Sequence, residues 1–300
     1  KAAVLYETNK PLKIEKVTLD EPQSNEVLVK IMATGVCHSD LHFMKGEMPV
    51  PVPVVPGHEG AGIVEKVGPG VTSLQPGDHV VMMVAFSCGK CRYCIEGKPT
   101  MCVENLPIQS MATLPGGGIR LHKGEQALNH MFGLASYAEY AVVHERSCVK
   151  VREDAPLDVL CLLGCGTSTG IGASINSTGI KPGESIAIFG CGGVGLSAVM
   201  GAKLAGAGKI IAIDTLDKKL KMAQKLGAEY LINVSQDDPM AKVMEITGGG
   251  ADYALECIGN VNVMTQAFAS IRFGGKFIVV GMAPLGTVFS IATYEFLLGK

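Results

Sequence analysis

Residues that could bind a metal ion gather in a few short stretches of this sequence. The octet GVCHSDLH, residues 35–42, holds a thiol, two imidazoles, a hydroxyl and a carboxylate. His58 and Glu59 follow in a glycine-rich turn, and Cys165 lies in GCGTSTGIGA. Taken singly, His58 could be a hydrogen-bonded polar side chain and Cys165 a small buried one. Taken together, the stretches supply two thiols and an imidazole, a donor set that suits zinc with one open position.

A second cluster consists of four cysteines with the spacing C-x2-C-x2-C-x7-C. Its members are Cys88, Cys91, Cys94 and Cys102. Four thiolates at such close spacing suit one tetrahedral structural Zn²⁺ with no open position. The loop has few apolar residues to bury, and structural zinc contributes about 10–16 kcal/mol to folding in small peptides. We therefore predict zinc here, with an iron–sulfur cluster or redox-active or uncommitted thiols as the alternatives.

A glycine loop follows a predicted strand in the second half of the chain. Gly190, Gly192 and Gly195 form G-x-G-x-x-G, with Gly193 inside it, and Asp214 ends the next predicted strand. Such glycines permit a tight turn, a close approach to a pyrophosphate, and helix–strand packing. The acid would bind the adenosine ribose, and because no Arg follows it immediately, we expect NAD and not NADP. A tight turn without a ligand is the alternative.

The first half of the chain must position these residues on strands. In EVLVKI, Val27, Val29 and Ile31 share one face at period two, which is typical of a half-buried strand. Similar runs include GAGIVEKV, GDHVVMMV and SYAEYAVV, several of them separated by turn formers. The prolines among residues 48–57 remove too many amide donors for a helix or a central strand, so we expect an extended loop there.

Beyond about residue 167 the pattern changes to alternating strands and helices. Strands are expected over 185–190 and 209–214, and helices over 194–206 and 217–226. This alternation predicts a parallel, doubly wound sheet with right-handed crossovers. A chain of 300 residues has the size at which one core usually splits into two.

Composition excludes several classes of function. The formal net charge is −2, so we expect no attraction to nucleic acid or anionic lipid. Apolar runs fall far short of the roughly 20 residues of a membrane span. The N-terminal segment lacks the apolar centre of a signal peptide, and clustered cysteines without one favour metal over disulfides. A cytoplasmic protein is expected, and the absence of an initial Met suggests processing or an omitted first residue.

With these motifs in order, the sequence resembles the zinc-dependent medium-chain alcohol dehydrogenase family. The stretches are GVCHSDLH, GHEGAGIVEKVGPGV, SCGKCRYCIEGKPTMC, LLGCGTSTGIGA and FGCGGVGLSAVMGAKLAGA. The resemblance implies an α/β protein with a GroES-like β-barrel catalytic domain over residues 1–166, which carries two zincs. A Rossmann NAD-binding domain is implied over 167–300. Family members then return to the barrel, so we expect that a C-terminal segment is missing.

The resemblance also assigns roles to single residues. It makes Cys37, His58 and Cys165 the ligands of the catalytic zinc and the four clustered cysteines those of the structural zinc. Further catalytic-domain roles are implied for Ser39 and His42 as proton relay, Asp40 as orienter of the histidine ligand, and Glu59 as an occasional zinc ligand. Cofactor contacts are implied for His38 at the pyrophosphate and for Thr169, Val194 and Lys219.

The implied reaction is hydride transfer between a primary alcohol and NAD, with zinc as Lewis acid. Met48 and Val84 suggest an apolar pocket for an aliphatic or aromatic alcohol. The alternative substrate is S-(hydroxymethyl)glutathione, because the segment 102–135 resembles the branch that contains glutathione-dependent formaldehyde dehydrogenase. A catalytically silent protein that binds zinc and NAD is a third hypothesis. The resemblance of GTVFSIA to a pairing strand implies a homodimer or a dimer of dimers.

Overall fold

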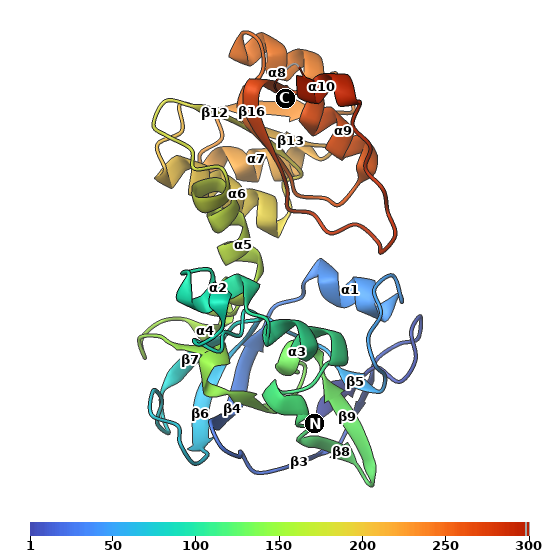
Figure 1. Cartoon of the computed structure of the whole chain (residues 1–300), viewed down its shortest axis with the longest axis vertical. Helices are drawn as coiled ribbons and strands as arrows, with labels where there is room; N and C mark the ends of the chain where they lie inside the picture. The colour runs from blue at the N-terminus through green and yellow to red at the C-terminus, as the bar shows by residue number, and fades with distance from the viewer. Residues whose placement is uncertain (298, 300) are drawn as a thin grey trace. The chain divides into compact units, whose positions relative to one another are not determined.

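The computed structural model describes residues 1–297 and residue 299. The chain divides into two compact units, Lys1–Cys165 and Gly166–Lys300, whose elements are labelled in Figure 1. The expectation of a missing C-terminal segment rests on the last residues of the chain. Of these, Leu298 and Lys300 lie outside the described residues.

The first unit is built around a five-stranded antiparallel sheet in the order β10-β4-β6-β7-β11. Its strands are β4 (Glu26–Thr34), β6 (Gly60–Val67), β7 (His79–Met82), β10 (Tyr140–His144) and β11 (Cys148–Lys150). Val27 and Val29 are fully buried in a core with Val64 and Val80, and Ile31 packs against that core. The predicted inward face of the strand is therefore confirmed.

Smaller sheets complete the unit. Four strands are ordered β3-β8-β9-β5, and two more form β1-β2. Their bounds are β1 (Ala2–Val4), β2 (Lys13–Glu15), β3 (Thr18–Leu19), β5 (Val54–Val55), β8 (Leu121–Lys123) and β9 (Gln126–His130). The expectation of a loop throughout 48–57 is wrong at Val54 and Val55, which keep their amide donors and pair with β9. This architecture is that of a GroES-like domain.

Short helices connect these strands. They are α1 (His38–Met44), α2 (Arg92–Ile95), α3 (Asn105–Met111) and α4 (Leu157–Leu160). Helical turns of three or four residues lie between them: η1 (Pro99–Met101), η2 (Pro115–Gly117), η3 (Met131–Gly133), η4 (Glu145–Ser147) and η5 (Cys161–Gly164). Helix α1 begins inside the octet GVCHSDLH, at His38, and apolar periodicity did not reveal it.

The second unit is a doubly wound α/β domain. Its parallel sheet has the order β14-β13-β12-β15-β16, so β12, the first of these strands along the chain, lies in the centre. The strands are β12 (Ser185–Phe189), β13 (Lys209–Asp214), β14 (Tyr230–Asn233), β15 (Ala251–Glu256) and β16 (Ile271–Val279). The helices are α5 (Gly166–Gly172), the π-helical η6 (Ala173–Ser177), α6 (Gly193–Leu204), α7 (Asp217–Leu226), α8 (Pro239–Thr247), α9 (Val261–Ala269) and α10 (Thr293–Leu297).

Alternate residues of the central strand enter two different cores. Ile186 and Ile188 pack with residues of α6 and α7, whereas Ala187 and Phe189 pack with residues of α8 and α9. Burial on both faces explains why these strands read as continuous apolar runs. In such sheets, ligands bind outside the carboxyl ends of the strands where the strand order reverses.

The cysteines outside the two clusters contribute to these cores. Cys148, Cys161, Cys191 and Cys257 each belong to, or pack against, an apolar cluster. Among the described residues, no single helix is long and apolar enough to cross a membrane, although one bent pair, Leu157–Gly164 with Gly166–Ser177, passes that test in combination.

Candidate zinc and dinucleotide sites

The first candidate site begins at the N-terminus of α1. Cys37 is the N-cap residue, and its backbone N–H donates to Asp40 Oδ2 at 3.0 Å. This bond belongs to a capping box between Cys37 and Asp40, which satisfies N–H groups that a helix end leaves unpaired. The local fold therefore fixes the backbone of Cys37 and turns the Asp40 carboxylate toward it.

Three donor atoms meet near this helix end. The ligand-type atoms of Cys37, His58 and Cys165 all lie within 4.8 Å of one another. His58 is 1% exposed, and both cysteines are partly buried. Two sulfurs and one imidazole nitrogen are soft and borderline donors that suit Zn²⁺, and three protein ligands leave a fourth position open.

Asp40 sets the orientation of the histidine. Its Oδ1 accepts from Gly57 N at 3.3 Å and lies 3.1 Å from His58 Nδ1. Its Oδ2 also accepts from the Tyr137 hydroxyl at 3.0 Å. With Nδ1 held by a carboxylate, the imidazole keeps Nε2 as its basic nitrogen, the tautomer that a metal requires.

The acid–base properties of the three donors reflect their closeness. A hydrogen bond from Cys165 lowers the pKa of the Cys37 thiol to about 3, and the same bond raises the pKa of Cys165. Burial alone would lower the pKa of His58, but its hydrogen bonds to Asp40 and Cys37 raise it to about 9. Without a metal, the cluster retains protons among its donors, and a bound cation would replace them.

The residues assigned to the proton relay follow on the same helix. Ser39 Oγ lies 3.5 Å from Cys37 Sγ, and the buried His42 Nδ1 lies 2.5 Å from Glu47 Oε2. The rings of His38 and His42 are 4.9 Å apart, with His38 exposed. The octet thus places a thiol, a hydroxyl, a carboxylate and two imidazoles within two helical turns.

Two further residues border the cluster. Glu59 is 3% exposed, and a Cβ at Gly35 would lie 2.1 Å from its Oε2, so a side chain at Gly35 would displace this carboxylate. Within the described residues, Glu59 is not one of the three whose donor atoms form the cluster. The Phe132 ring meets His58 edge-on at 5.0 Å, although its backbone has φ of +54°. A left-handed conformation at a bulky residue stores strain, which often accompanies a functional site.

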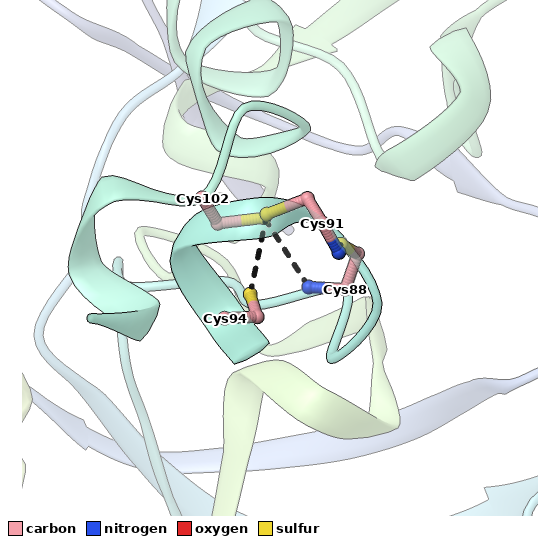
Figure 2. Close-up of side chains that lie close together, drawn as sticks. All are labelled: Cys88, Cys91, Cys94 and Cys102. Carbon is pink, nitrogen blue, oxygen red and sulfur yellow. Dashed lines mark hydrogen bonds between the residues drawn. The ribbon is translucent and has the colours of Figure 1, made fainter. Parts of the chain in front are cut away.

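The four clustered cysteines form a second candidate metal site (Figure 2). Their sulfur atoms all lie within 4.8 Å of one another, and the side chains point toward a common centre. Backbone amides also point at the sulfurs: Cys88 N donates to Cys102 Sγ at 3.3 Å and Cys91 N to Cys88 Sγ at 3.3 Å. Backbone hydrogen bonds from Cys94 and Val103 lower the pKa of Cys91 to about 6. Four converging sulfurs fit a structural zinc, which is four-coordinate and has no open position.

The four-cysteine loop is hydrogen-bonded to the rest of its unit by a residue outside the cysteine motif. Arg146, on η4, donates from Nη1 to the carbonyls of Ser87 and Cys88. Next to it, the rings of Phe86 and His144 meet edge-on at 5.1 Å. The cysteine loop therefore has a fixed base on the main sheet.

The glycine loop of the second unit has the geometry expected for a dinucleotide. Gly190 has φ of +94°, and a Cβ at Gly195 would lie 1.7 Å from Gly190 O, so both positions require glycine. A Cβ at Gly192 or Gly193 would meet no atom within 4 Å. These two glycines line open space at the first turn of α6, where backbone N–H groups can approach a phosphate.

The remaining residues predicted for the cofactor surround this loop. Asp214 ends β13 and accepts from Cys191 N at 2.8 Å and Leu216 N at 3.0 Å, and Lys219 Nζ lies 3.6 Å away. A Cβ at Gly170 would lie 2.2 Å from Val194 O, so α5 packs tightly on α6 and Thr169 lies exposed beside the loop.

Sequence reasoning missed several neighbours of these sites. Glu47 could have been found from Gly46, because glycine after a helix commonly allows the chain to turn back on its last turn. Tyr137 and Phe132 have no such local signal, since they come from segments far along the chain. Arg146 belongs to no sequence motif that would have indicated its contact with the cysteine loop.

Comparisons with known proteins agree with this geometry. Residues 23–153 match the alcohol dehydrogenase GroES-like domain, and residues 193–299 match the zinc-binding dehydrogenase domain. The chain is 44% identical to S-(hydroxymethyl)glutathione dehydrogenase of Synechocystis, over all of this chain and 82% of that protein. It is 41% identical to the enzyme of the same name from Saccharomyces cerevisiae, over all of this chain and 80% of that protein.

A solved structure is similarly close. Benzyl alcohol dehydrogenase from Acinetobacter calcoaceticus superposes with a TM-score of 0.93 at 41% identity, over 99% of this chain and 81% of that one. Identities and coverage of this size, together with two family domains that span most of the chain, establish the family. The chain belongs to the zinc-dependent medium-chain alcohol dehydrogenase family and is a dehydrogenase with zinc and a nicotinamide dinucleotide as its cofactors.

Proposed function

We propose that this enzyme transfers hydride between a primary hydroxyl group and NAD, at a zinc held by Cys37, His58 and Cys165. The observation that carries the proposal is the convergence of these three donors, with Asp40 holding His58 through Nδ1. When bound, zinc would act there as a Lewis acid that lowers the pKa of an alcohol. The converging sulfurs of the four-cysteine loop would hold a second, structural zinc.

The side chains around the donors would accept the proton that the alcohol loses and pass it to water. Ser39 places a hydroxyl beside Cys37, where it can accept the proton that the alcohol loses. His42, five residues after Cys37 on the same helix, would take that proton on its imidazole and release it to water. Glu59 supplies a buried negative charge whose effect reaches Cys165.

The second unit would bind the dinucleotide. Gly190, Gly192, Gly193 and Gly195 would cradle the pyrophosphate, with Val194, Thr169 and His38 as further contacts. Asp214 would accept hydrogen bonds from the adenosine ribose, and its charge disfavours a 2′-phosphate, which supports NAD over NADP. Lys219, 3.6 Å from Asp214, would flank the same ribose.

The first substrate to test is S-(hydroxymethyl)glutathione. The curated relatives at 41–44% identity carry that name, which favours it over the simple primary alcohol that the sequence predicted. An aromatic primary alcohol is the second candidate, because the Phe132 ring lies against His58 and Met48 packs in an apolar cluster. The similarity to a benzyl alcohol dehydrogenase supports this candidate.

NADH formation distinguishes the candidates. The zinc-loaded protein is offered formaldehyde with glutathione, formaldehyde alone, benzyl alcohol and ethanol. Turnover that requires glutathione supports the adduct, and turnover of benzyl alcohol supports the aromatic alcohol. His58→Asn should abolish either activity and remove one zinc, whereas His122→Asn, in a histidine paired with Asp20 at the surface, should change neither. If the protein binds two zincs but turns over none of these substrates, the result supports the hypothesis of a catalytically silent protein that binds zinc and NAD.

Location and assembly stay predictions. We propose a cytoplasmic homodimer or dimer of dimers that pairs through the edge of the second unit. The edge strand β16 and the segment after it expose the apolar side chains of Phe273, Leu285 and Val288. A monomeric mass in sedimentation would contradict this assembly.

A further inference from the structure

Helix α1 ends in a motif that brings Glu47 back onto the helix. Gly46, with φ of +70°, donates its N–H to Phe43 O at 3.1 Å, and Glu47 N donates to His42 O at 2.9 Å. These two bonds define a Schellman motif, in which the second residue past the helix cap lies against the third residue before it. In this helix those two residues are Glu47 and His42.

The contact between the two positions is usually hydrophobic, but here it is an imidazole and a carboxylate. Glu47 Oε2 lies 2.5 Å from His42 Nδ1, with 8% of the histidine side chain and 35% of the glutamate side chain exposed. A carboxylate at this distance accepts the Nδ1 proton, so the basic nitrogen of His42 is Nε2. The backbone turn at the end of the helix therefore brings this buried imidazole and the partly buried carboxylate together.

We propose that Glu47 is the positioning residue of the proton relay, a role that rests on the proposed function of His42. The proton lost by the alcohol arrives at His42 Nε2, where a new N–H bond forms and the imidazole becomes an imidazolium. Glu47 stabilises that charge through its bond to Nδ1–H. Water then removes the proton from His42 and restores the neutral ring, so no net charge accumulates.

The variant Glu47→Gln tests the role because the amide keeps the size of the side chain and removes its charge. We expect kcat for the best substrate to fall about tenfold, well below the roughly 10²–10⁴-fold that a positioned general base contributes, with KM unchanged. In a His42→Ala background the same substitution should cost nothing further, since a residue that acts only through His42 has nothing left to position. Asp20→Asn, which removes the charge beside His122, is the matched control and should leave kcat unchanged.

A second readout does not depend on turnover. Long-range ¹⁵N–¹H spectra of the full-length, histidine-labelled protein report which imidazole nitrogen carries the proton. The signals of His42, identified by their absence in His42→Ala, should show protonation at Nδ1 in the wild type. In Glu47→Gln both tautomers should be populated, because an amide can donate as well as accept.

The outcomes separate the inference from the proposed function. A kcat within twofold of the wild type for Glu47→Gln, or an equal loss with and without His42, overturns the inference while the dehydrogenase activity stands. If the wild type oxidises no substrate, the proposed function fails, and the spectra alone decide: an Nε2-protonated ring in the wild type overturns the pairing as well.

Discussion

The carboxylate of Asp40 is the group whose loss has the most calculable effect. It is 1% exposed and accepts from Cys37 N, Gly57 N, His58 Nδ1 and the Tyr137 hydroxyl. Asp40→Asn keeps the shape but turns one of its two oxygens into an NH₂ group. Both orientations of the new amide conflict with a donor.

If the amide nitrogen replaces Oδ2, it faces the Cys37 N–H, while the Tyr137 hydroxyl can rotate to accept a hydrogen bond from the amide. If it replaces Oδ1, it faces the Gly57 N–H, and His58 must present Nδ1 as an acceptor, which moves its proton to Nε2. Either orientation leaves one buried backbone donor unsatisfied, at a cost of about 1–3 kcal/mol in the free energy of unfolding. The second orientation also removes the nitrogen that binds zinc, so we expect zinc affinity at this site to fall about 10–100-fold.

Two measurements on the same protein check this reasoning. Urea unfolding gives the loss of stability, and competition with a chelator gives the zinc affinity, with the zinc of the four-cysteine loop as internal reference. Asp252→Asn is the matched control, because Asp252 accepts from Ser185 and Arg272 in the other unit and should lower stability without affecting zinc. A zinc affinity within twofold of the wild type for Asp40→Asn, together with a His58 ring that is protonated at Nε2 in the metal-free variant, would refute the argument that the tautomer selected by Asp40 is the one that binds zinc.

Four other substitutions have expected outcomes that different measurements can check. Gly195→Ala should destabilise the second unit, because its Cβ would lie 1.7 Å from a carbonyl oxygen, whereas Gly192→Ala should leave urea unfolding unchanged and weaken NADH binding in a fluorescence titration. Burial lowers the pKa of His130 to about 3, so the unfolded chain binds more protons between that pH and about 6.5, and stability falls on acidification. His130→Asn should remove up to about 1.4 kcal/mol per pH unit from that slope, as measured by urea unfolding at pH 7 and pH 5. Cys94→Ser should release one zinc equivalent, as measured by metal analysis, and leave Cys37 and its partners able to bind the other.

The sequence was most informative where chemistry and spacing coincide. The four-cysteine loop could be predicted because all its donors lie in one short segment, and the glycine loop because its strand and helix flank it directly. The β12, β13 and α7 bounds agree closely with the predicted ranges, since apolar periodicity reports burial. The predicted helix over 194–206 ends earlier, at Leu204.

The misses have a common physical origin. Helix α1 has only seven residues, of which Phe43 and Met44 pack into an apolar cluster, so it shows no apolar stripe long enough for periodicity to detect. Tyr137 reaches Asp40 across 97 positions, a contact that exists only once the sheets have assembled. Phe132 adopts a left-handed backbone that residue type argues against, and only its surroundings impose it.

The caps of α1 couple the folding of this helix to its chemistry. A seven-residue helix is too short to persist by itself, so its two ends must be stabilised from outside the backbone ladder. Those ends consist of Cys37 with Asp40 and of Glu47 with His42, which are also the groups proposed to bind metal and to move the proton. By linkage, a ligand that binds the ordered helix also favours its formation, so metal loading and local order should rise together. An engineer who changes the specificity of this segment therefore also changes its folding equilibrium, and substitutions here should be selected for both properties at once.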